Sequence, residues 1–426
     1  MRKLNSLLFN TSYGVTEITL LMVALLLLTI SSCTKRSEDE LNNIAAYRPD
    51  ASQAQKIDYT AVNTPTTLTD RVNGVDYIIS HDLNINQGRF TIEPGVTIMF
   101  EDGAGIVVNQ GAALTAIGSE GKEIYFISRS GKRGAWNGIT FLSDNADNVL
   151  SYCVVKEGGS STSSYGRANV IVAKTSHLAS VEISHSTITT SDNVGILVGE
   201  GSQIRNFTGN IITTNTSYPL SVYAANTAFL SGSNTYTNNG KQFIELTGYE
   251  NSAIRQPVTL KNIALPYAVT GTLTAHNAVK IEPGVRLYMN SGSQLTIDGL
   301  NGSGTFNAVG TATQPIMLTG VYNTSGIWNA INFRGSASAT NRLEYCVITS
   351  GGGNASGNHG MINLSGSNSA ISQVDIRHCT ISNSASHGVY IQRNTTEFNA
   401  DIETVNTFAN NAGANVYYDV SIASGE

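Results

Sequence analysis

Short runs of β-forming residues alternate with polar turns along most of this 426-residue chain. One stretch reads TIMF at 97–100, GIVV at 105–108, ALTA at 113–116 and IYFI at 124–127, with turn-forming residues between the runs. Apolar residues alternate with others inside such runs, which places one face of each strand in a core. No long amphipathic helix pattern follows residue 60. The pattern therefore predicts an all-β protein.

The chain also contains an internal duplication. Four blocks recur in the same order, and the distance between the two copies grows only from 189 to 193 residues. The paired blocks are IEPGV at 92–96 and 281–285, WNGITF at 136–141 and WNAINF at 328–333, LSYCVV at 150–155 and LEYCVI at 343–348, and VEISHSTI at 181–188 and VDIRHCTI at 374–381. This order predicts two tandem modules, 59–255 and 256–426, that form one continuous structure.

Many short strands are typical of an antiparallel sandwich or of a stacked solenoid. The turns lack regular two-residue NG loops and the duplication is in line, which favours the solenoid. Cys346 and Cys379 stand 33 residues apart in matching contexts, which fits one coil plus a loop. We therefore expect Tyr345 and His378 at the same corner of neighbouring coils, with both cysteines facing inward. A coil of roughly 24 residues would give about 15 coils.

The repeated blocks resemble those of a known protein family. The IEPGV block, the PI pair at 315–316 and the WxxIxF block are similar to those of right-handed parallel β-helix repeat proteins, which are abundant among bacterial surface lipoproteins. The resemblance covers nearly all of residues 60–420 and implies a right-handed parallel β-helix. It implies little about activity, because this fold carries lyases, hydrolases, esterases and adhesins.

The first 32 residues have the features of a targeting segment. Arg2 and Lys3 precede an apolar run at 18–30, whose length suits a signal peptide better than a membrane span. The run ends in ISSC at 30–33, which resembles the lipobox of bacterial lipoproteins. The resemblance implies cleavage after residue 32, lipidation of Cys33 and attachment to a membrane through acyl chains. The alternative is an uncleaved N-terminal helix with an incidental cysteine.

Residues 33–58 are expected to form a flexible tether. Their charge run, KRSEDE at 35–40, favours a solvated spacer. It also resembles the acidic tract that follows the lipidated cysteine in lipoproteins displayed on the outer face of the outer membrane. We therefore expect a lipid anchor in the outer membrane, with display at the cell surface or, alternatively, at the periplasmic face. Residues 41–60 are expected to cap the first coil.

Charge and cysteine usage narrow the function classes. A formal net charge of −6 excludes a generally basic nucleic-acid binder. Besides Cys33 the chain has Cys153, Cys346 and Cys379, and a Cys346–Cys379 disulfide is one alternative for the last two. Side chains pointing the same way from adjacent parallel strands fit disulfide geometry poorly, so buried free thiols are favoured. No cysteine or histidine spacing is typical of a metal site, and neither a metal nor a cofactor is expected.

The candidate ligand-binding residues form a modest patch in the first module and one duplicate in the second. They are Lys132, Arg133, Trp136, Tyr165, Arg167 and Trp328. The two tryptophans are either sugar-stacking platforms or packing residues, and their faithful duplication favours packing. For the charged residues the alternative is a solvated loop.

No catalytic set emerges from the sequence. His359 and His387 each stand beside a glycine, which resembles the GHG element of β-helical polygalacturonases, but the paired aspartates of that family are missing. The carboxylate cluster with a basic residue that pectate lyases need is missing as well.

The leading hypothesis is a non-catalytic binding or adhesion scaffold, anchored in the membrane, with extracellular glycan or another surface protein as its ligand. A polysaccharide lyase or other glycan-active enzyme with an unrecognised site is the alternative. A third option is a structural stalk.

Overall fold

The computed structural model describes residues 36–173, 176–248, 253–263, 265–353 and 359–420. The predicted signal peptide, 1–32, and Cys33 lie outside the described residues. The chain divides into two units, 1–46 and 47–426, which are described separately.

The described part of the first unit contains helix α2 (Glu38–Ala46). A capping box begins it: the Glu40 N–H donates to Ser37 Oγ at 3.2 Å, and the Ser37 N–H donates to the Glu40 carboxylate at 2.6 Å. Acidic side chains in the first turn add a favourable interaction with the helix dipole. This stretch of the predicted flexible tether is therefore helical.

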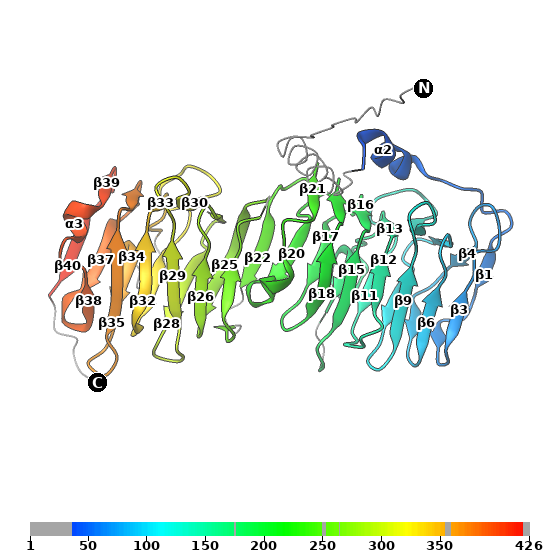
Figure 1. The fold of residues 1–426 in the computed structure, drawn as a ribbon, viewed down its shortest axis with the longest axis horizontal. Coiled ribbons are helices and arrows are strands. Elements are labelled where there is room, and N and C mark those ends of the chain that lie inside the picture. The colour runs from blue at the N-terminus through cyan, green and yellow to red at the C-terminus, as the bar shows by residue number, and fades with distance from the viewer. Residues whose placement is uncertain (1–35, 174–175, 249–252, 264, 354–358, 421–426) are drawn as a thin grey trace, which may run out of the picture. The chain divides into compact units, whose positions relative to one another are not determined.

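The second unit consists of stacked coils of short strands that pair in parallel with the strands of the next coil (Figure 1). Five sheets, named I to V here, run along the stack. Sheet I contains β1 (Gln55–Ile57), β4 (Tyr77–Ile79), β7 (Thr97–Phe100), β10 (Ile124–Ser128), β13 (Cys153–Lys156), β16 (Thr187–Thr189), β19 (Ile211–Thr213) and β21 (Thr235–Thr237). Sheet III contains β3 (Thr66–Leu68), β6 (Arg89–Ile92), β9 (Ala113–Ile117), β12 (Val149–Ser151), β15 (Ser180–Ser184) and β18 (Gln203–Thr208).

The other three sheets reach into the second half of the chain. Sheet II contains β2 (Ala61–Val62), β5 (Leu83–Ile85), β8 (Gly105–Val108), β11 (Gly138–Phe141), β14 (Ala168–Val172), β17 (Val194–Val198), β20 (Leu220–Tyr223), β22 (Ile244–Gly248), β25 (Tyr267–Ala275), β27 (Arg286–Met289), β30 (Ile316–Gly320), β33 (Cys346–Thr349), β36 (Thr380–Ser382) and β39 (Thr407–Ala409). Sheet IV contains β23 (Ala253–Ile254), the second half of β25, β28 (Gln294–Asp298), β31 (Ile331–Arg334), β34 (Gly360–Ser365), β37 (His387–Gln392) and β40 (Val416–Asp419). Sheet V contains β24 (Val258–Leu260), β26 (Ala278–Ile281), β29 (Thr305–Val309), β32 (Ala337–Glu344), β35 (Ser372–Arg377) and β38 (Thr396–Phe398). The short helices are η1 (Ala224–Phe229), η2 (Arg393–Thr395) and α3 (Ile402–Val405).

This all-β arrangement of long parallel sheets is consistent with the expected parallel β-helix. It excludes the antiparallel sandwich, because the ladders between successive strands are parallel. Strand β1 lies within the segment predicted as tether, so the first coil begins earlier than the sequence pattern suggested.

The two copies of the duplicated blocks lie on different sheets. Strand β13, which begins with Cys153, belongs to sheet I, whereas its copy β33, which begins with Cys346, belongs to sheet II. The change occurs at β25, whose first half pairs with β22 and whose second half pairs with β23. Gly271 sits at this point with φ +80°, and a Cβ there would lie 2.4 Å from the Gly248 carbonyl oxygen. Only glycine fits this crossing between sheets.

Side chains that point into the coils form one continuous apolar cluster, from Ile57 in the first coil to Ile402 near the last. Cys153, Cys346 and Cys379 belong to this cluster as free thiols, which confirms the prediction. The adjacent Cys379 thiol and burial raise the pKa of the Cys346 thiol, so it stays protonated. Full burial of an aliphatic side chain contributes about 1.5–3 kcal/mol, and the stack repeats that gain in every coil.

The corners between strands also stack. The Tyr345 ring lies on the His378 ring at 4.9 Å, and in the first module Tyr152 lies on His185 at 4.8 Å. All of these residues have φ between 49° and 54°, the left-handed conformation that turns the chain sharply. The predicted shared corner is confirmed.

Buried amide side chains connect neighbouring coils. The Ser191 N–H donates to Asn215 Oδ1 at 3.0 Å, and the Asn215 N–H donates to Asn239 Oδ1 at 3.1 Å. Asn210 and Asn234 repeat the arrangement at another corner, with a bond of 3.0 Å. These ladders satisfy backbone groups that turn away from the sheets, where no strand partner exists.

A strap, residues 47–54, crosses the outer face of sheet I before β1 begins. The Tyr47 ring packs on Tyr125 at 4.3 Å, and its hydroxyl lies 3.3 Å from Thr97 Oγ1. Farther along, the Asp50 carbonyl accepts the Val75 N–H at 2.7 Å. Ala51 and Ala54 pack on an outer apolar cluster. The strap thus connects several coils of the first module along their length.

Charged groups lie under the beginning of the strap. Arg48 pairs with the Glu157 carboxylate, which also accepts the Ser128 hydroxyl at 2.8 Å. Lys156 is fully buried and donates from Nζ to the Tyr47 carbonyl at 3.0 Å. Burial lowers the pKa of Lys156 to about 8, and the positive charge of Arg48 adds to this effect, although Glu157 opposes it. The strap therefore covers an ammonium group at neutral pH.

Replacing Asn215 with alanine should lower the free energy of unfolding by about 1–3 kcal/mol, because it leaves the buried Ser191 N–H without an acceptor. Urea denaturation measures this loss. Asn394→Ala, on the exposed η2 turn, is the matched control and should leave the midpoint unchanged. An equal effect of both changes would contradict a structural role for the amide ladder.

Replacing Lys156 with methionine should abolish one component of the pH dependence of stability. The unfolded lysine titrates at about 10.5 and the folded one at about 8. Between these values the unfolded state binds more protons, so wild-type stability should gain up to about 1.4 kcal/mol per pH unit relative to the variant. Below pH 8 the difference between the two proteins should be constant. Chemical denaturation at pH 7.5 and 10 measures it, with the exposed Lys132→Met as control; parallel curves for wild type and Lys156→Met would refute the interpretation.

Candidate ligand-binding surface

The two tryptophans proposed from the sequence are packing residues. Both indole rings are completely buried. The Trp136 Nε1–H donates to the Lys156 carbonyl at 2.8 Å, and the Trp328 Nε1–H donates to the Thr349 carbonyl at 2.9 Å. Trp136 also stacks on Phe100 at 4.1 Å. As ligand-contact residues they are excluded, because neither ring has an accessible face.

The basic residues of the predicted patch gather around one turn. Arg133 donates to the carbonyls of Ser191 and Thr214, and Arg167 pairs with the Asp192 carboxylate. These contacts connect both guanidinium groups to the corner of a neighbouring coil. Both arginines are still exposed at the surface, so a ligand role for them stays a prediction.

The other two residues of that patch, Lys132 and Tyr165, are accessible as well. Lys132 is exposed, and Tyr165 lies beside a small depression that Asp82 and Asn137 also line. Asn137 donates to Asp82 Oδ1 at 3.0 Å and to the Gly103 carbonyl, which ties these groups to each other. A ligand role of Lys132 and Tyr165 stays a prediction.

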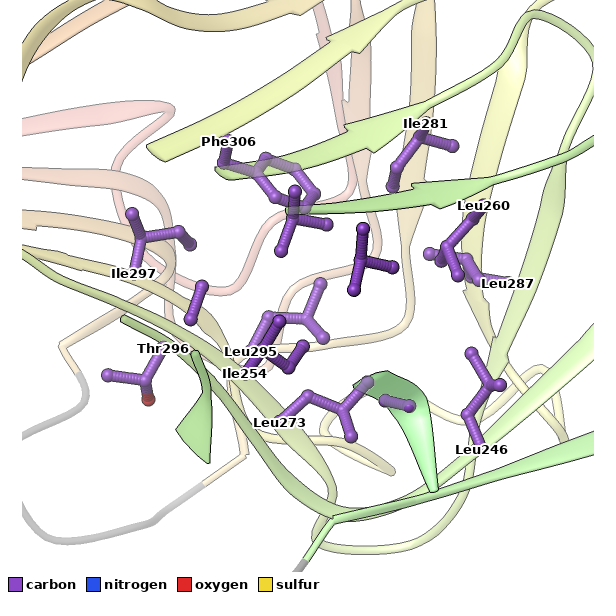
Figure 2. Close-up of a pocket in the computed structure, with 14 residues that line it drawn as sticks. Leu246, Ile254, Leu260, Leu273, Ile281, Leu287, Leu295, Thr296, Ile297 and Phe306 are labelled. Carbon is purple, nitrogen blue, oxygen red and sulfur yellow. The ribbon is translucent and has the colours of Figure 1, made fainter. Parts of the chain in front are cut away.

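An enclosed apolar space lies inside the coils where sheet IV begins. Figure 2 shows Leu246, Leu273 and Leu295 around it, and apart from Thr296 every lining residue is apolar. Its volume of about 20 Å³ would hold a water molecule at most, and an apolar lining keeps such a space dry. It is a packing gap near the point where β25 passes from sheet II to sheet IV.

A polar groove lies along sheet V in the last coils. Strands β32, β35 and β38 and the residue after β38 supply its lining, and β32 bulges between Ala337 and Arg342. The lining residues are Ala339, Asn341, Gln373, Val374, Asp375, Arg377, Glu397, Phe398 and Asn399. Its volume of about 320 Å³ reaches the lower end of the range for small-molecule sites. Amide, carboxylate and guanidinium groups beside an aromatic ring suit a polyhydroxylated ligand.

An ion-pair network holds one side of this groove. Arg377 donates from Nε to Asp375 at 2.9 Å and from Nη1 to Asp401 at 2.7 Å. Hydrogen bonds from Asn399 and Arg377 hold the pKa of Asp401 below its usual value. Arg342 lies 3.5 Å from Asp375 on the neighbouring strand. The network keeps these side chains oriented, and a bound ligand would find them already ordered.

Sheet IV carries an aromatic and amide row in the same coils. Asn332, Asn363, Tyr390 and Tyr417 stand opposite one another on successive strands. The Tyr390 and Tyr417 rings are nearly parallel at 5.9 Å, and the Tyr390 hydroxyl donates to the Asp419 carboxylate.

Two histidines noted in the sequence flank this row. The His387 ring stacks on Tyr417 at 4.5 Å, and the His359 ring lies 4.7 Å from Tyr390. The His387 N–H donates to the His359 carbonyl at 3.4 Å, so the structure brings together two histidines that are 28 residues apart in the chain.

Differences between the two copies of the repeat could have indicated this surface from the sequence. Glu182 and Ser184 of the first module correspond to Asp375 and Arg377 of the second within a block whose apolar residues are kept. On the outer row, Leu197 in β17 takes the place that Tyr390 has in β37. The apolar positions of the block repeat, whereas Ser184 corresponds to Arg377 and Leu197 corresponds to Tyr390.

Comparisons with protein-family models, curated proteins and solved structures found no match to this chain. Within the described residues, no helix combines the length and apolar composition needed to cross a bilayer. In the same part of the chain, no three His, Cys, Asp or Glu side chains come together in a way that could hold a metal ion.

Proposed function

We propose that this chain is a lipoprotein of the bacterial outer membrane that displays a right-handed parallel β-helix of two tandem modules at the cell surface. Its role is to bind extracellular glycan without catalysis, through the groove on sheet V. The groove is the observation that carries the proposal, since it combines amide, carboxylate and guanidinium groups with Phe398.

The chemistry of the groove supports a sugar ligand. Sugar hydroxyls both donate and accept, and the amide group of Gln373 does the same. The Asp375 and Glu397 carboxylates are acceptors, and Arg377 is a donor held by two carboxylates. Protein sites for small polar ligands commonly consist of such a few convergent polar groups over apolar surface.

The anchor is supported by the sequence and by the path of the strap. ISSC at 30–33 resembles a lipobox, and the segment that follows enters the second unit at Tyr47. Through Tyr47 and Arg48 the chain is attached to the strands that carry Tyr125 and Lys156 and to Glu157, well away from β1. A pull on a lipid anchor would therefore act on several coils at once.

The binding role is tested with the double variant Gln373→Ala, Glu397→Ala. A glycan array followed by calorimetry should identify a ligand whose affinity falls about tenfold or more in the variant, as expected for the loss of two hydrogen bonds. Glu182→Gln, at the position in the first module that matches Asp375, is the matched control and should bind normally. Failure of the wild type to bind any glycan would refute the proposal, as would formation of unsaturated product from acidic polysaccharide with or without Ca²⁺.

The anchor is tested with Cys33→Ser. Wild-type protein should fractionate with the outer membrane and enter the detergent phase on phase separation, whereas the variant should not, because it lacks the acyl chains that hold it. Cys153→Ser controls for the loss of a thiol and should stay membrane-bound. Equal membrane association of Cys33→Ser and wild type would argue against lipidation.

A further inference from the structure

A hydrogen bond joins the last described coil to one ring nitrogen of His387. The His387 Nδ1 accepts the backbone N–H of Ala414 at 2.9 Å. Ala414 lies in the turn 410–415 that connects β39 to β40. The same ring stacks on Tyr417 of β40, with 4.5 Å between ring centroids and an angle of 12° between the planes. One imidazole thus contacts both the turn and the strand that complete the last coil.

The hydrogen bond determines the protonation state of the ring. A backbone amide can only donate, so Nδ1 must carry its lone pair and the neutral ring must carry its proton on Nε2. A second proton would have to enter at Nδ1, where it would face the Ala414 N–H. The bond and the positive charge are therefore mutually exclusive.

The seat of the ring is also sterically tight. A Cβ at position 413 would lie 2.5 Å from His387 Nδ1, so Gly413 is the residue type that lets the turn approach this closely. The backbone N–H of Gly388, on the same strand as His387, donates to the Ala414 carbonyl at 3.0 Å. A charged ring would have to move away from the Ala414 N–H, and the turn 410–415 would lose this contact.

The surrounding groups do not favour a positive charge. The His387 ring lies against Tyr417 of β40 and interacts with the neighbouring His359, which precedes β34. Tyr390 on the same strand and Asp419 on β40 are the next ionisable groups, and the turn 410–415 carries no ionisable side chain. The Asp419 carboxylate is hydrogen-bonded to the Tyr390 hydroxyl. Burial, and then the neighbouring His359, lower the pKa of His387 below 6.5.

We propose that His387 is a pH-sensitive latch: the neutral ring fastens the turn 410–415 and β40 to the preceding coil, and proton uptake at Nδ1 releases them. The proposal goes beyond glycan binding and does not depend on it. The sign follows from linkage. Above pH 6.5 the ring is neutral whether the coil is closed or open, so closure is unaffected. As pH falls below 6.5 the open form takes up the proton first, and opening becomes easier until the closed form titrates as well.

Hydrogen exchange of the full-length protein in detergent tests the latch. Deuterium uptake is followed at pH 7.5 and 5.5, with labelling times scaled for the intrinsic pH dependence of exchange. Peptides covering 407–420 should open more at pH 5.5 in the wild type, whereas in His387→Asn, whose Oδ1 keeps an acceptor but cannot be protonated, their opening should not change. His177→Asn, at an exposed histidine elsewhere, should behave as wild type. No rise in the wild type, or the same rise in His387→Asn, would overturn the proposal.

A second measurement guards against a variant that fails to close at either pH. Nitrogen-15 spectra of the wild type, labelled at histidine and assigned by the signal missing in His387→Asn, report tautomer and titration directly. The latch requires the Nε2–H tautomer at pH 7.5 and a midpoint below 6.5. An Nδ1–H tautomer, or a midpoint above 6.5, would overturn it.

Discussion

Everything in the second unit depends on the stacking of inward side chains from one coil on those of the next. A single coil has too little apolar surface to stay folded, since it leaves one face of every strand in water. Parallel pairing with both neighbouring coils removes that exposure, and the apolar cluster runs without a break from Ile57 to Ile402. Free thiols and indoles pack in this repeating interior, and amide side chains bond the backbone groups of the corners.

This constraint explains what the two modules keep and what they change. Trp136 and Trp328 are both buried with their indole N–H groups bonded to a backbone carbonyl, because each fills the same space in its module. Outward positions carry no such requirement. There Ser184 is replaced by Arg377, and Leu197 by Tyr390. A solenoid can therefore acquire a binding surface on a few coils without disturbing its core.

The same logic applies to the segments that lie over the coils. The strap over sheet I buries Lys156 and pairs Arg48 with Glu157, so charged groups attach the start of the second unit to the coils beneath it. In the last coils, His387 joins the final turn to the strand before it. Both devices act by hydrogen bonds at places where the apolar stack alone would leave a segment loosely attached.

Four features could be predicted from the sequence: the strand periodicity, the duplication, the shared corner of Tyr345 and His378, and the buried thiols. These follow from local alternation and from repeats that are legible in one dimension. The folded chain was needed to show that the copied strands β13 and β33 lie on different sheets, and that the backbone of His387 reaches that of His359. Which strands become neighbours depends on the length of every preceding coil. It also depends on Gly271, where β25 passes from one sheet to another. Local patterns show which face of a strand points inward, whereas the neighbours across coils are set by the accumulated register of the whole stack.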